Sequence, residues 1–160
     1  MHARSDNVSC VETSEFVTFV RKHGLGVVAT LGPNGTPQAA VVAILATELG
    51  EVIFGCKRGS RKFANIQRRP EVALAIGWES DGVTVQCEGI ADEPTGADRE
   101  RCLKCYLDRF PSEQRLVESQ TIALVRVRMN WIRYADTRRE SFRWEETFPA
   151  GSSSQSRGTP

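Results

Sequence analysis

The stretch that decides the fold is residues 52–72, VIFGCKRGSRKFANIQRRPEV, in which an apolar strand passes through a basic loop into a short helix and then into another strand. Ser60 is a good helix N-cap, because its hydroxyl can accept a hydrogen bond from an amide of the first turn. The helix must end by Arg69, since the residue before Pro70 is pushed out of helical geometry. Six cations and no acid lie between positions 57 and 69: Lys57, Arg58, Arg61, Lys62, Arg68 and Arg69.

The first turn of this helix carries Arg61 and Lys62, although the N-terminus of a helix prefers acids. Two cations beside free amide donors are an electrostatic cost unless an anion binds there. A phosphate would be stabilised by the amides, by the Ser60 hydroxyl and by both side chains. We therefore expect Ser60, Arg61 and Lys62 to hold a phosphate, the alternative being that the two cations are simply solvated surface charges.

Towards the N-terminus, the pattern predicts a helix over 13–23 and then a β-hairpin. GVVATL, Gly26–Leu31, is an apolar run rich in β-branched residues, and GPNG at 32–35 is a strong turn signal. The returning strand, Thr36–Thr47, is apolar on both faces, so one face can fill a barrel and the other needs a cover, which a second copy of the chain would provide. One face holds Ala39, Val41, Ala43 and Leu45, and the other holds Ala40, Val42 and Ile44. Residues 52–56 form the third strand.

Towards the C-terminus, further strands are expected at 72–78 and 83–93, the second with alternating apolar and polar residues. From 96 to 110 the apolar period changes to that of a helix. The last strand runs from about 121 to 135. Six strands joined mostly by tight turns, with short helices at the ends, predict a mainly β protein built as a small antiparallel barrel.

The length of 160 residues fits one domain, which we expect to span 13–148. Residues 1–12 show no periodicity and are expected to form a flexible arm, and 149–160 have the composition of a disordered tail. A net charge of +1 means that any anion site must be local. No run reaches the roughly 18 apolar residues of a membrane span and the start is no signal peptide, which predicts a cytoplasmic protein without membrane contact.

The cysteines predict neither disulfides nor a metal site. The chain has five cysteines, an odd number, and three of them fall inside expected strands or helices, which suits reduced intracellular thiols. Cys102 and Cys105 form a C-x-x-C pair, but zinc would need two more ligands, and His2 and His23 lie far away in sequence. The pair also lies inside a helix rather than at its start, where redox pairs usually occur. We expect ordinary thiols on a helix surface.

Three segments resemble one known family: GPNGTPQAAVV at 32–42, FGCKRGSRKFANIQRRPEVAL at 54–74 and VTVQCEG at 83–89. With them, residues 16–136 are similar to the pyridoxamine 5′-phosphate oxidase-like proteins, which are split β-barrels that bind flavin mononucleotide (FMN). The middle segment is the specific one, since Ser-Arg-Lys after an apolar strand, followed by a helix and Arg-Pro, is that family's phosphate signature. The resemblance implies a six-stranded antiparallel split barrel and a homodimer with the cofactor at its interface.

The resemblance also implies which residues contact the cofactor. Ser60, Arg61 and Lys62 would hold the FMN phosphate. The other implied contacts are the backbone of the second strand, the end of the third strand and one residue of the fifth strand: Ala40, Val41, Val42, Gly55, Cys56 and Thr84.

Three departures separate the chain from the oxidase that names the family. Ala40 and Leu45 stand where that enzyme has an arginine and a lysine, and Thr84 stands where it has a flavin-contacting glutamine. Its C-terminal Arg-x-His pattern is not found in TRRESFRWEE, residues 137–146. The resemblance thus favours a flavin-binding relative over a true vitamin B6 oxidase.

The leading hypothesis is an FMN-dependent oxidoreductase that acts on a small-molecule substrate or electron donor. The flavin would supply the redox chemistry while the protein orients it and excludes water, so no catalytic side chain is assigned. One alternative keeps the fold and binds a deazaflavin or haem, because the lost cations leave room for another cofactor. Another is a non-catalytic flavin-binding sensor. Nucleic-acid binding is disfavoured by the net charge of +1.

Overall fold

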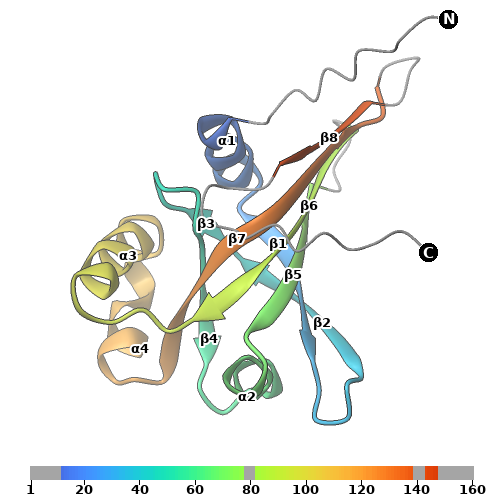
Figure 1. Cartoon of the computed structure of the whole chain (residues 1–160). Helices are drawn as coiled ribbons and strands as arrows, with labels where there is room; N and C mark the ends of the chain where they lie inside the picture. Colours follow the sequence, from blue (N-terminus) through green and yellow to red (C-terminus); the bar gives the residue numbers. More distant parts are fainter. Residues whose placement is uncertain (1–11, 78–81, 139–142, 148–160) are drawn as a thin grey trace, which may run out of the picture.

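The computed structural model describes residues 12–77, 82–138 and 143–147 of the chain. The expected tail and all of the expected N-terminal arm except Glu12 therefore lie outside the described residues. Within them, one antiparallel sheet of eight strands curls around a hydrophobic core, with helix α1 at one end and helix α2 at the other (Figure 1).

The strands follow the order β2-β1-β5-β6-β7-β4-β3, and β8 pairs with β7. Their bounds are β1 Leu25–Leu31, β2 Pro37–Ala43, β3 Leu45–Ala46, β4 Val52–Lys57, β5 Glu71–Ile76, β6 Val83–Asp92, β7 Ile122–Asp136 and β8 Arg143–Thr147. Strands β2 and β3 follow each other in the chain but lie at opposite ends of the sheet order, so the sheet curls back on itself and the barrel is split between β2 and β4. Helix α2 contacts β4 on one side of this split and β1, the strand behind β2, on the other, and it also contacts β6.

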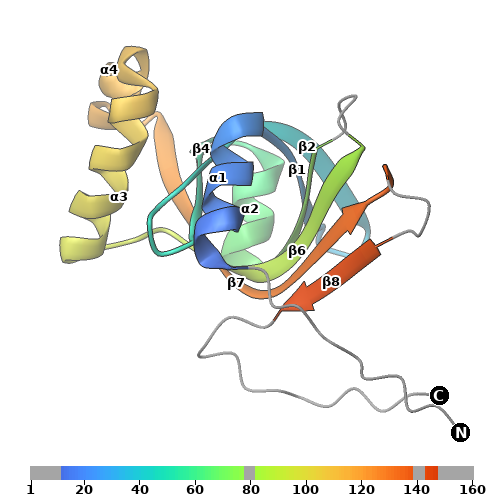
Figure 2. The same cartoon turned by 90° about the horizontal axis from the view of Figure 1, so that it is seen from above.

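The described helices are α1 Thr13–His23, α2 Arg61–Arg68, α3 Gly96–Arg109, the single 3-10 turn Pro111–Glu113, and α4 Gln114–Glu118. Seen from above, along the barrel, α1 and α2 cover the two ends of the ring of strands, and α3 and α4 lie to one side of it beside β4 (Figure 1 and Figure 2). None of the helices in the described part of the chain is long and apolar enough to cross a membrane.

The main core follows from the alternation along each strand. On β5 and β6 every second side chain points inwards, so that Leu74 is 2% and Val85 is 0% exposed. A second, smaller cluster lies where α3 and α4 pack against β3, β4 and β7, and it holds Leu45, Ile53, Cys102, Tyr106, Val117 and Leu124. The barrel therefore has one core inside and another beneath α3.

The mainly β split-barrel class is confirmed, but the single strand expected over Thr36–Thr47 is wrong. The strand breaks at Ile44 into β2 and β3, because the chain crosses there from the edge of β1 to the edge of β4. Leu45 keeps the face opposite to Val42 and Ile44, as expected, but α3 covers it there, so that it is 5% exposed whereas Val41 is 64% exposed. Strand β8 was not expected either, so the described sheet has eight strands rather than six.

Candidate functional site

Ser60 caps the helix that follows β4, as the sequence predicts. Its backbone is extended (φ −81°, ψ 150°), and its Oγ accepts a hydrogen bond from the Phe63 amide at 3.2 Å. Its own amide donates to the Lys57 carbonyl at 3.0 Å, which closes the turn out of β4. Phe63 and Ile66, both 5% exposed, anchor α2 in the main core. The N-terminus of α2 is thus held directly beside the end of β4.

The first turn of α2 contains no acid, and its two cations have no acidic partner in the described part of the chain. Arg61 is exposed, whereas Lys62 is half-buried, with its Nζ 5.6 Å from the centroid of the Phe54 ring. Arg58 of the same loop differs, because its two terminal nitrogens bind the carboxylate of Glu93. Positive charge at the N-terminus of α2 is therefore not neutralised by the described residues around it.

The residues at this junction fit a phosphate group. The amides of Arg61 and Lys62 belong to the first helical turn, and none of the residues placed by the structure accepts a hydrogen bond from them. These two N–H groups stand at the positive end of the helix dipole together with two cationic side chains and the Ser60 hydroxyl. Amide donors, cations and a hydroxyl on three consecutive residues are a set that suits a doubly charged anion.

Cys56 reaches the same junction from inside the barrel. It is 1% exposed and belongs to the main core, and its Sγ lies 3.3 Å from Ser60 Oγ. This thiol therefore packs against the capping residue and is not a surface nucleophile.

Strand β2 has an open edge on the side of the split. It pairs with β1 alone among the described strands, so part of its backbone N–H and C=O groups have no strand partner. Ala40 is half-buried, Val41 is 64% exposed, and Val42 points into the core at 7% exposure. The second strand can thus present main-chain hydrogen-bonding groups to a ligand without any polar side chain.

The positions of Gly55 and Leu45 are covered by α3. A Cβ added at Gly55 would overlap the hydroxyl of Tyr106, which itself donates a hydrogen bond to the carboxylate of Glu113. Burial and the contact with Glu113 raise the pKa of Tyr106 well above its usual range. Leu45 lies in the same cluster as Tyr106. The glycine is therefore explained by the close approach of a tyrosine to β4.

Thr84 lies apart from the other candidates within one chain. It is half-buried on β6, on the side opposite to the core residues Val83 and Val85. Strand β7 separates β6 from β4, and β5 and β1 separate it from β2. Of the expected site residues, the structure brings Ser60, Arg61, Lys62 and Cys56 together, sets Ala40–Val42 on the facing edge of the split, and leaves Thr84 on another part of the sheet.

The outer face of the sheet near β2 is apolar, and none of the described residues covers it. Val41 and Val27 are cross-strand neighbours on β2 and β1, and Ala39 and Ala29 form the next pair on this face. Further along, a cavity of about 290 Å³ is lined by residues of β1, β2, β5, β6 and β7: Ala29, Thr30, Leu31, Pro37, Glu71, Val72, Ala73, Glu88, Gly89, Ile90 and Asn130. The uncovered face predicted for the second strand therefore persists on β2, at Ala39 and Val41.

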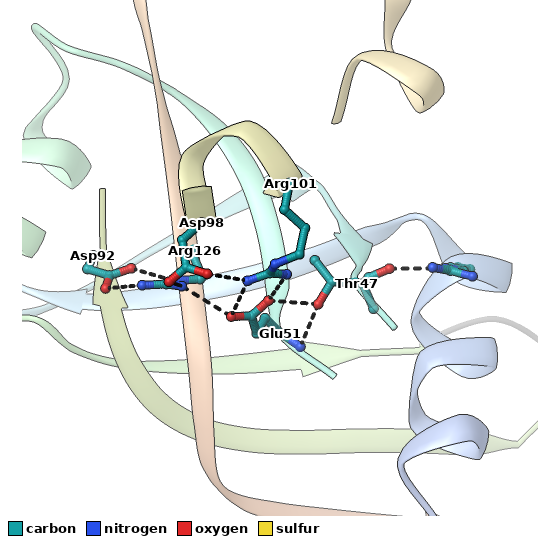
Figure 3. A network of polar contacts seen from close by, with 8 residues as sticks. Thr47, Glu51, Asp92, Asp98, Arg101 and Arg126 are labelled. Carbon is teal, nitrogen blue, oxygen red and sulfur yellow. Dashed lines mark hydrogen bonds and ion pairs between the residues drawn. The ribbon is translucent and has the colours of Figure 1, made fainter. Parts of the chain in front are cut away.

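A buried ion network that sequence reasoning missed joins α3 to the barrel (Figure 3). Arg126 of β7 lies at its centre, with a side chain 6% exposed. Its guanidinium donates to both oxygens of Asp92 at 2.9 and 2.7 Å, to Asp98 at 2.7 Å and to Glu51 at 3.2 Å. Arg101 of α3 donates two more hydrogen bonds to Glu51, at 2.6 and 3.1 Å.

Glu51 is the most buried carboxylate of this network. Burial by itself raises the pKa of Glu51, but hydrogen bonds from Arg101 and Thr47 and the charges of Arg101 and Arg126 outweigh it, so the pKa lies below its ordinary value of 4.5. The members come from positions 47 to 126, so no local pattern indicates them. The one signal in the sequence is the arginine at 126 between two core valines.

Comparison with known proteins places the chain in a family. Residues 13–135 match the sequence profile of the family described as pyridoxamine 5′-phosphate oxidase. The pyridoxine/pyridoxamine 5′-phosphate oxidase of Granulibacter bethesdensis is 34% identical over 68 residues, which are 39% of this chain and 32% of that enzyme. The match thus covers about a third of the length of this curated relative.

Solved structures share the fold at low identity. A haem-binding protein from Mycobacterium smegmatis superposes with a TM-score of 0.73 at 19% identity, covering 88% of this chain and 60% of that one. A pyridoxamine 5′-phosphate oxidase-related, FMN-binding protein from Nostoc punctiforme PCC 73102 superposes with a TM-score of 0.63 at 11% identity, covering 84% and 93%. Since the profile match spans most of the described barrel, the chain belongs to the pyridoxamine 5′-phosphate oxidase family.

Proposed function

We propose that this protein binds FMN with its phosphate at the N-terminus of α2, and that it is a flavin-dependent oxidoreductase. The observation that carries the proposal is the pair of cations, Arg61 and Lys62, in a first helical turn that contains no acid, where their own two amides have no acceptor among the described residues. The family membership supports it, and one structural relative is described as FMN-binding.

The roles of the chain's own residues follow from this placement. Arg61, Lys62 and Ser60 would bind and orient the phosphate, while the open edge of β2 would offer backbone groups to the ring. When bound, FMN would supply hydride or electron transfer to a small-molecule substrate or donor. The buried side chains beneath, Phe54 and Cys56, would keep water away from the inner side of the site.

A second copy of the chain would complete the site in this proposal. Val41 is 64% and Leu25 is 45% exposed on neighbouring strands, which is the kind of surface that a homodimer buries. Thr84, which lies away from α2 within its own chain, would then contact the cofactor held by the partner. Val41→Lys should convert the dimer to a monomer in analytical ultracentrifugation, and a monomeric unmodified protein would refute this part.

The test of the cofactor is a titration followed by flavin fluorescence, with FMN and with riboflavin, which lacks the phosphate. Arg61→Gln and Lys62→Gln should each weaken FMN binding about ten- to hundredfold, because each removes a charge-assisted hydrogen bond of about 1.5–3 kcal/mol. Riboflavin binding should stay unchanged. Arg69→Gln is the matched control, since it removes an exposed cation at the other end of α2.

Two outcomes would contradict the proposal. One is a protein that takes up no FMN, and the other is a pair of first-turn variants that bind FMN as tightly as the unmodified chain. Parallel titrations with a deazaflavin and with haem complete the design, because a relative of this fold is described as haem-binding. If the protein binds either of them more tightly than FMN, that ligand replaces FMN in the proposal.

A further inference from the structure

Asn65 is a buried polar residue in the middle of α2 that links this helix to two strands. It is 2% exposed. Its Nδ2 donates to Thr30 Oγ1 at 3.0 Å and to Gln38 Oε1 at 2.9 Å, and its Oδ1 accepts from Arg68 at 2.6 Å. A buried carboxamide with both donors and its acceptor engaged rigidifies the elements that it connects.

The two strand residues that Asn65 contacts are themselves a pair. Thr30 of β1 and Gln38 of β2 are cross-strand partners, so one amide group fixes this pair of strands against α2. The contact lies on the open side of the barrel, where β2 has no described strand neighbour to hold its edge. Asn65 therefore sets the separation between the N-terminus of α2 and the free edge of β2.

This separation matters to a ligand that binds both elements. Gln38 lies two residues before Ala40 on the edge, and Asn65 lies five residues after Ser60 on the helix. At the rise per residue of a strand and of a helix, the bridge is about 7 Å along each element from its half of the proposed site. A ligand held by its phosphate at one place and by its ring at the other gains from both contacts only if their spacing is fixed beforehand.

We propose that Asn65 is a positioning residue of the cofactor site, which rests on the proposed FMN function. It touches neither the phosphate group nor the ring. It keeps the edge of β2 at the distance from α2 at which one FMN molecule can contact both elements. Its loss therefore weakens the binding of FMN more than the binding of riboflavin or of phosphate alone.

The experiment replaces Asn65 by leucine, which has the same number of side-chain heavy atoms and the same branching but no polar group, and measures three ligands by flavin fluorescence. FMN and riboflavin are titrated directly, and inorganic phosphate is measured as a competitor of FMN. Asn65→Leu should weaken FMN binding about tenfold or more, while the binding constants for riboflavin and for phosphate change by less than about twofold. Arg61→Gln, in contrast, should weaken the binding of inorganic phosphate itself.

A matched set of variants separates positioning from stability. Thr30→Val removes one hydrogen bond of the bridge at constant shape and should reproduce part of the FMN loss, whereas Thr30→Ser keeps the hydroxyl and should bind FMN normally. Ile66→Val loses packing at the neighbouring helix position and should leave the FMN affinity unchanged. If Asn65→Leu fails to fold, the comparison of Thr30→Val with Thr30→Ser decides the question.

Each result bears on a different statement. If the affinity of the Asn65→Leu or Thr30→Val variant for FMN is within about twofold of that of the unmodified chain, the positioning role alone is refuted. Equal weakening by Ile66→Val, in proportion to its loss of thermal stability, also refutes it. An unmodified protein that binds riboflavin and FMN equally, or neither, refutes the proposed phosphate site and this inference with it.

Discussion

Replacing Arg126 by methionine should destabilise the fold far more than the same change two residues away. The Arg126 side chain is 6% exposed and binds Asp92, Asp98 and Glu51. Removing one partner from a buried charge cluster costs about 3–5 kcal/mol, because the charges left behind are poorly solvated. Asp92 and Asp98 are 31% and 51% exposed and can rehydrate. Glu51, which is 11% exposed, keeps Arg101, so we expect the lower end, about 3 kcal/mol.

Arg128→Met is the matched control, because Arg128 lies on the same strand and also contacts Asp92, at 3.2 Å. Its side chain is 55% exposed, so its loss should cost less than about 1 kcal/mol. Equilibrium unfolding in urea at pH 7, with equal m-values required for both variants, measures the difference. If the two variants differ by less than 1 kcal/mol, or if Arg126→Met is the more stable protein, the reasoning about the buried network is wrong.

Two further predictions concern the same part of the fold. The free energy of unfolding should fall in acid. The pKa of Glu51 in the folded protein lies below its ordinary 4.5, so the contribution of Glu51 to the free energy of unfolding is complete above about pH 4.5 and is lost as the pH drops through the lower folded pKa. Melting temperatures between pH 7 and pH 3 measure this fall, which Glu51→Gln should make shallower; an equally steep fall in that variant would contradict it. Gly55→Ala should cost about 1–3 kcal/mol in urea unfolding, because the new methyl group overlaps the Tyr106 hydroxyl, and Tyr106→Phe in the same chain should recover part of the loss. An alanine variant as stable as the unmodified protein would show that Tyr106 moves freely.

The helix cap and the core strands could be predicted because their causes are local. Ser60 caps α2 because its hydroxyl accepts a hydrogen bond from the amide three residues on. The alternation of buried and exposed side chains along β6 follows from the order of neighbouring residues. The prediction of one continuous strand over Thr36–Thr47 was wrong for the opposite reason, because the cause of the break is not local. Its break at Ile44 depends on where β1 and β4 lie in the closed sheet, which no window of a few residues contains.

The sequence by itself determined the mainly β class and the basic helix start at Arg61 and Lys62, since periodicity, capping and the preference of helix ends for charge act over one or two turns. Only the tertiary structure decided that Arg126 is buried among carboxylates and that Asn65 bridges α2 to β1 and β2. These contacts join residues 27 to 75 positions apart. How much they stabilise the fold depends on how far burial desolvates the groups, because a buried polar group that loses its partner is costly, and burial depends on what covers a side chain and not on its neighbours in the chain.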